Sequence, residues 1–168
     1  MNVARDARKG LLRGVLGGVF IVALTVAPAW ASVSASYGTV TAITPTLITG
    51  TSTNGCTGYC MAGSATFKSS GTVATTVQVV VYLYRFKSST QTAAVCSNTG
   101  PCSDTLLRQV SSSIATKSGT SATTTVTASV SCTSLQSATY GYYTRAVMSN
   151  GTSTQYMETS PLLKVKGC

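Results

Sequence analysis

Residues 76–86 read Thr-Val-Gln-Val-Val-Val-Tyr-Leu-Tyr-Arg-Phe, a run of β-branched and aromatic residues that decides the fold. Such a run is typical of a central β-strand. Because side chains alternate across a strand, one face is aliphatic and the other is mostly aromatic. The aliphatic face consists of Val77, Val79, Val81 and Leu83, and the other face of Val80, Tyr82, Tyr84 and Phe86. One face must pack in a core, while the second is either covered by another element or open to a partner.

The first 31 residues have the pattern of a cleaved secretory signal peptide. A basic segment that ends at Arg13 precedes 14 apolar residues, Gly14 to Ala27, and Ala29-Trp30-Ala31 places small residues at both cleavage-defining positions. An uncleaved anchor would need about 20 apolar residues, and this segment is shorter. We therefore expect a secreted protein, extracellular or associated with the cell envelope, whose mature chain does not insert stably into a membrane.

Residues 32–168 are expected to form a single cationic domain. Eight basic and two acidic residues remain after Ala31, which gives a net charge of +6. A positive field favours association with anionic material, so an anionic envelope polymer, a glycan or another extracellular protein is the expected partner. The basic residues are dispersed and no nucleic-acid motif occurs, so we do not expect nucleic-acid binding.

All six cysteines follow the predicted leader, and an even number in an exported domain predicts three disulfides. Sequence alone cannot choose among the 15 possible pairings. Two pairs are close enough to close short loops, and a third pair is then left over. These pairs are Cys56 with Cys60, Cys96 with Cys102, and Cys132 with Cys168. A zinc site is the competing interpretation, but histidine is absent and the spacings are not CxxC pairs, so we expect no metal and no cofactor.

The rest of the mature chain favours short antiparallel strands with hydroxyl-bearing outer faces. Residues 122–132 alternate strictly between Ala or Val and Thr or Ser, as expected of a half-buried strand. Asn150-Gly151 is a hairpin signal between two further strands. Other expected elements are a strand at 39–44 that Pro45 stops and that Leu47 and Ile48 can resume as an edge, a loop at 51–64, a short strand at 65–68, a long loop at 88–104, a strand at 105–116 and an edge strand at 162–165. These elements predict an all-β domain, a single disulfide-stabilised antiparallel β-sandwich, with a closed barrel as the alternative.

The last 45 or so residues resemble the closing strands of an immunoglobulin or fibronectin type III-like sandwich. The residues that carry this resemblance are Leu135, Tyr140 or Tyr142, Ala146, Met148, Asn150-Gly151 and Ser160-Pro161. The resemblance implies a two-sheet architecture in which a tyrosine corner precedes the last hairpin.

Residues for catalysis are scarce in the mature chain. There is no histidine, and Asp104 and Glu158 are its only carboxylates. Such a pair could serve glycoside hydrolysis, but no motif surrounds either acid. The serines lack a histidine base, and no nucleophile-elbow motif occurs. We therefore expect that the protein is not an enzyme.

Tyrosine and arginine, which recognition surfaces favour, recur on the central strand and in the C-terminal hairpin. If these residues form a binding site, we expect it to consist of Tyr59, Tyr82, Tyr84, Tyr143 and Arg145. The alternative is that the aromatic residues only cover sheet faces, where their strand propensity is high.

The expected function is that of a non-catalytic binding or structural module at the cell envelope or on an extracellular partner. An inhibitor of an extracellular hydrolase is the alternative, with the loop between Cys96 and Cys102 as the contact segment, because rigid disulfide-closed loops are preorganised for binding. A membrane-active cationic protein is a weaker third class, since no amphipathic basic helix is predicted.

Overall fold

The computed structural model describes residues 30–50, 56, 58–132 and 140–165, and these residues form strands joined by turns and loops. The prediction of an all-β domain is therefore confirmed for this part of the chain. The strands are β1 (Trp30–Ala35), β2 (Gly38–Gly50), β3 (Gly58–Ser69), β4 (Thr75–Arg85), β5 (Thr105–Thr116), β6 (Thr123–Ser131), β7 (Tyr140–Ser149), β8 (Thr154–Glu158) and β9 (Leu162–Val165).

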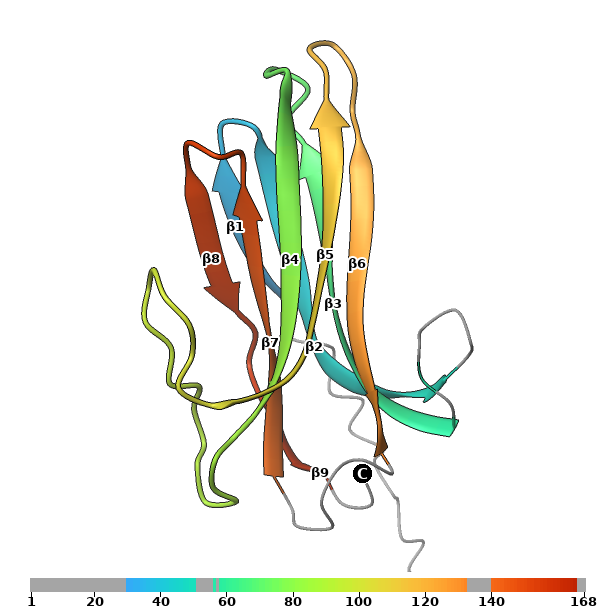
Figure 1. Ribbon diagram of the computed structural model, residues 1–168, viewed down its shortest axis with the longest axis vertical. Coiled ribbons are helices and arrows are strands. Elements are labelled where there is room, and N and C mark those ends of the chain that lie inside the picture. Colours follow the sequence, from blue (N-terminus) through green and yellow to red (C-terminus); the bar gives the residue numbers. More distant parts are fainter. Residues whose placement is uncertain (1–29, 51–55, 57, 133–139, 166–168) are drawn as a thin grey trace, which may run out of the picture.

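The strands are arranged in two antiparallel sheets (Figure 1). The first sheet has the order β1-β2-β3-β6, and the second has the order β5-β4-β7-β8, with β9 also paired to β7. The chain passes from one sheet to the other after β3, after β5 and again after β6. Two layers that pack face to face are the arrangement expected of a β-sandwich.

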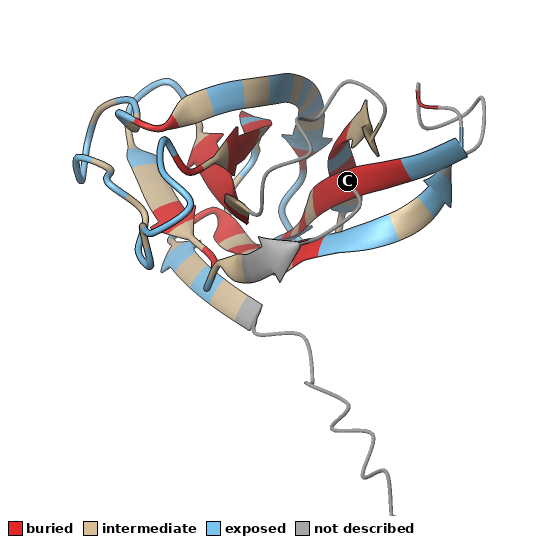
Figure 2. Cartoon of the chain, turned by 90° about the horizontal axis from the view of Figure 1, so that it is seen from below, coloured by how far each residue is buried: buried red, intermediate tan, exposed pale blue. Residues whose placement is uncertain are grey.

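The core lies between the two sheets, and Figure 2 shows buried residues, in red, on strands of both sheets. The aliphatic face of β4 points into it, and Val77, Val79, Val81 and Leu83 are all fully buried. β4 pairs with both β5 and β7, so the prediction of a central strand is confirmed. The alternation predicted for residues 122–132 is also confirmed, because Val126 and Ala128 of β6 join the same core.

One prediction in the first sheet is confirmed and another is wrong. The register of β2 with β3 is interrupted at Pro45, between Ile43 and Thr46, and β2 then continues to Gly50 with residues 46–50 paired to β3 alone, as predicted for Leu47 and Ile48. Proline, which cannot donate a hydrogen bond, is tolerated at such an irregularity. Residues 58–64 are not a loop: β3 begins at Gly58 and pairs with both β2 and β6. Pairing on both sides keeps this glycine-containing segment extended.

β1 begins within the predicted leader. Trp30 pairs with Ile43 and Ala31 pairs with Ala42, so cleavage after Ala31 would remove these two pairs and shorten the edge strand. Two of the predicted disulfides, Cys56–Cys60 and Cys96–Cys102, are present. Cys132 is also disulfide-bonded, and its predicted partner Cys168 lies outside the described residues.

Two separate groups of hydrogen bonds join the two sheets. The buried hydroxyl of Tyr37, in the turn between β1 and β2, donates to the carbonyl oxygens of Met148 at 3.3 Å and Ser153 at 3.0 Å. Thr144 of β7 is fully buried, and its Oγ1 donates to the carbonyl oxygen of Ile43 at 3.0 Å. A Cβ at Gly63 of β3 would collide with the Thr144 side chain, so the close approach of the sheets requires glycine at this position.

We expect Gly63→Ala to lower the free energy of unfolding by about 1–3 kcal/mol, because the added methyl group overpacks the contact with Thr144. Urea denaturation of the oxidised protein measures this change. Ser64→Ala is the matched control, since Ser64 is the next residue along the strand and points to the opposite face. Equal stability of the two variants would contradict the described contact between the sheets.

Candidate functional site

The aromatic face of β4 is covered by residues 87–103 of the connection between β4 and β5, which we call the covering loop. Figure 1 shows this segment passing across the lower part of β7 and β4 on its way to β5. Tyr84, Phe86 and Tyr143 form a second buried cluster on this outer face, with Ala94 of the covering loop packed against it. The second face of the central strand is therefore covered by the protein's own chain at this end.

The disulfide between Cys96 and Cys102 gives the covering loop its shape. The two cysteines also pair as an isolated antiparallel bridge, so residues 97–101 form a short closed tip. Ser97, Asn98 and Thr99 of this tip are exposed.

The carboxylate of Asp104 connects the covering loop to Tyr143 of β7. It is buried and accepts three hydrogen bonds: from Nε2 of Gln91 at 2.9 Å, from the backbone N–H of Val95 at 3.0 Å and from the hydroxyl of Tyr143 at 2.9 Å. Burial, together with the hydrogen bond to Asp104, raises the pKa of Tyr143 far above its usual value of 10.0. Tyr143 is therefore a proton donor to this carboxylate throughout the physiological pH range.

The guanidinium of Arg145 anchors the tip of the covering loop. Its NH1 lies 3.1 Å from Oε1 of Glu158 and donates to Sγ of Cys102 at 3.1 Å, while NH2 donates to the carbonyl oxygen of Ser97 at 3.0 Å. Its Cζ also lies 4.9 Å from the ring centroid of Tyr156. Arg145 is only 1% exposed, so this charge is neutralised and hydrogen-bonded inside the protein.

Aromatic rings form a continuous row along the outer face. Tyr82 stacks on Tyr84 with centroids 6.1 Å apart, Tyr84 stacks on Tyr143 at 5.3 Å, and Phe86 lies 5.7 Å from Tyr143. The covering loop buries Tyr84, Phe86 and Tyr143, whereas Tyr82 at the end of the row is only partly buried. The row therefore begins beneath the covering loop and ends with an accessible ring.

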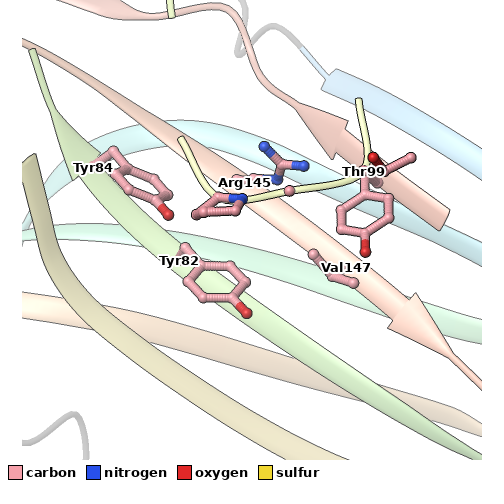
Figure 3. Close-up of a pocket in the computed structure, with 8 residues that line it drawn as sticks. Tyr82, Tyr84, Thr99, Arg145 and Val147 are labelled. Carbon is pink, nitrogen blue, oxygen red and sulfur yellow. The ribbon is translucent and has the colours of Figure 1, made fainter. Parts of the chain in front are cut away.

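A cleft of about 250 Å³ lies beside the tip of the covering loop (Figure 3). β4, β7 and β8 form its floor and sides, and the tip of the covering loop forms its wall. Its lining consists of Tyr82 and Tyr84 from β4, Arg145 and Val147 from β7, Tyr156 from β8, and residues 99–101 of the tip. Tyr82 and Tyr156 are both partly exposed, on the two strands that flank β7.

The structure brings together four of the five residues predicted for a binding site. Tyr82, Tyr84, Tyr143 and Arg145 share the outer face of the second sheet, but Tyr84, Tyr143 and Arg145 are buried. Of the four, Tyr82 offers a partly exposed ring to the cleft. Tyr59 lies apart from them, in β3 of the first sheet, and is 73% exposed.

Tyr156 is the site residue that sequence reasoning missed. The hairpin signal at Asn150-Gly151 contains the information, because β8 pairs with β7 in the register Val147↔Tyr156. The observed connection pairs Ser149 with Thr154, two residues longer than the tightest hairpin. A shift of two residues leaves a side chain on the same face, so the outward direction of Tyr156 could have been predicted.

The groups that could support chemistry are engaged in holding the covering loop. Cys96, Cys102 and Glu158 lie close enough to bind a metal together, but the two sulfur atoms form a disulfide and are not available as thiolates. Of the two carboxylates, Asp104 accepts three hydrogen bonds and Glu158 pairs with Arg145.

No protein-family model matches this chain, and no curated protein matches it in sequence. Among the described residues, no helix has the length and apolar character needed to cross a membrane.

We expect Asp104→Asn to lower the free energy of unfolding by about 1.5–3 kcal/mol, because the amide has one acceptor oxygen for three donors and the carboxylate charge is lost. Urea denaturation of the oxidised protein measures the loss. Ser103→Ala is the control, since Ser103 is the adjacent residue and is exposed. A loss no larger than that of Ser103→Ala would show that Asp104 does not anchor the covering loop.

Proposed function

We propose that this protein is a non-catalytic binding module that is exported and engages an extracellular or cell-envelope partner through the cleft. The observation that carries the proposal is the pair of partly exposed tyrosine rings, Tyr82 and Tyr156, beside a wall that a disulfide and buried hydrogen bonds hold in place. Tyrosine supplies a large contact area with few rotatable bonds. A preorganised wall lowers the entropic cost of binding.

The engagement of the polar groups supports a binding role over a catalytic one. A general acid or base needs access to substrate, and Asp104 is buried beneath the covering loop. Glu158 is paired with the buried Arg145. In this proposal both carboxylates act by shaping the site.

The disulfides and the predicted leader support an extracellular location. Disulfides persist in oxidising compartments, and the described cysteines include no free thiol. We therefore place the module outside the cell or at the cell envelope.

The strand order supports an architecture of the immunoglobulin or fibronectin type III type. β4, β7 and β8 are neighbours in one sheet, and β2, β3 and β6 are neighbours in the other, as strands C, F, G and A, B, E are in such sandwiches. A tyrosine corner is a finer expectation. The hydroxyl of Tyr142 has no hydrogen-bond partner among the described residues, and the preceding residues, 133–139, lie outside the described part of the chain.

Hydrolase inhibition is a second candidate, favoured by the tip of the covering loop. Residues 97–101 are closed by a disulfide, and the carbonyl of Ser97 is held by Arg145. An exposed, rigid segment of this kind suits insertion into the site of another protein. This candidate predicts a dependence on Asn98 and Thr99, which are exposed, and not on the tyrosine rings.

The test is capture of partners from the wall fraction and the secreted proteins of the source culture by the immobilised, oxidised protein at low and high salt. We expect Tyr82→Ala and Tyr156→Ala each to reduce capture by about tenfold or more, as for central contact residues. Capture should resist salt, because Arg145 in the cleft is already paired with Glu158.

Tyr59→Ala is the matched control, since this exposed tyrosine lies on the other sheet. Capture that depends on Tyr59 and not on the cleft tyrosines would overturn the proposed site. Salt-resistant capture of one secreted hydrolase that is lost in Asn98→Ala, and retained in both cleft variants, would favour the inhibitor.

A further inference from the structure

The dimensions of the cleft limit what it can hold. Its volume of about 250 Å³ is smaller than the roughly 300–1,000 Å³ of sites that enclose drug-sized ligands. A larger partner must therefore place one ring or one side chain in the cleft and continue over the neighbouring surface.

Two aromatic rings, Tyr82 on β4 and Tyr156 on β8, stand on opposite sides of the cleft, and each contacts a neighbouring side chain. Tyr84 stacks on one side of Tyr82, and the guanidinium of Arg145 lies over the ring of Tyr156. Tyr82 and Tyr156 stand on strands two positions apart, about 10 Å across the sheet, because neighbouring strands are about 4.8 Å apart. An aromatic face carries partial negative charge and attracts the polarised C–H groups of a flat saturated ring.

The cleft offers no unpaired charge to a ligand. Arg145 is the ionised residue in its lining, and it is buried against Glu158. An anionic or cationic ligand would therefore lose hydration without gaining a new ion pair. A neutral ligand avoids this cost.

The surface next to the cleft is rich in neutral hydrogen-bonding groups. The strand pairing places a row of polar residues on the same outer face, two residues along the strands from the cleft. This row consists of Gln78 on β4, Ser149 on β7 and Thr154 on β8. Ser111 and Ser113 continue the same rows on β5, and both are exposed. Hydroxyl and amide groups act as both donors and acceptors, which suits a ligand that carries many hydroxyls.

We propose that the cleft binds one sugar ring of a neutral polysaccharide, packed against Tyr82 and Tyr156, while the chain continues over the hydroxyl-rich outer face of β5, β4, β7 and β8. This inference rests on the proposed function and specifies its ligand class. It differs from the anionic polymer that the net charge suggested, because the net charge is spread over the surface whereas the cleft itself is neutral.

The test measures binding of the oxidised protein to soluble neutral polysaccharides (a β-glucan, a xylan and chitin oligosaccharides) by affinity electrophoresis and calorimetry. We expect at least one of them to bind, with about a tenfold or greater loss of affinity in Tyr82→Ala and in Tyr156→Ala. Tyr82→Phe and Tyr156→Phe keep the ring, so they should retain most of the affinity and show that the alanine variants act through stacking. Tyr59→Ala should bind as the wild type does.

Four results would overturn the inference. Salt-sensitive binding of polygalacturonate alone would identify an anionic ligand held by the surface charge. Binding of poly-L-proline in place of the sugars would identify a proline-rich peptide, because such peptides also dock in aromatic grooves. Failure of every neutral polysaccharide to bind, while the cleft variants still lose partner capture, would reject the sugar and leave the proposed binding module intact. If the cleft variants lose neither polysaccharide binding nor partner capture, the sugar site and the proposed binding cleft are both rejected.

Discussion

The buried guanidinium of Arg145 is the contact on which the site depends. It joins β7 to Glu158 of β8, to Ser97 and Cys102 of the covering loop, and to the ring of Tyr156. A buried charge is stabilised only when it is paired and hydrogen-bonded, so removing one of these partners destabilises the others. The hairpin, the loop tip and one aromatic wall are therefore held as a single unit.

This unit divides the outer face of the second sheet into two parts with different roles. On one side of the loop tip, the hydrogen bond between Tyr143 and Asp104 joins the buried aromatic cluster to the covering loop. On the other side of the tip, Tyr82 and Tyr156 are partly exposed. The polar residues that first suggest chemistry thus belong to the supporting structure, and the recognition surface consists of rings and neutral polar groups.

The pattern of residues 76–86 was enough to predict the central strand and its buried aliphatic face, because strand alternation is a local property. The sandwich followed from the several short strands and turns predicted along the mature chain. The pairing of Cys96 with Cys102 followed from short spacing. The burial of Tyr143 and Arg145 could not be predicted, since it depends on the path of residues 87–103 over the sheet. Residues 58–64 were missed for a similar reason: glycine-containing sequence reads as a loop unless the strands on both sides are known.

The most direct test of this account is a solution NMR measurement of the contacts between the loop tip and the sheet in the oxidised protein. Nuclear Overhauser effects should connect the Cβ protons of Cys96 with the ring protons of Tyr143, because Sγ of Cys96 lies 3.4 Å from the Tyr143 hydroxyl oxygen. Ordered backbone signals for Ser97 should accompany them, since its carbonyl accepts from Arg145. A loop tip with no such contacts and averaged signals would contradict the claim that a fixed wall forms the binding cleft.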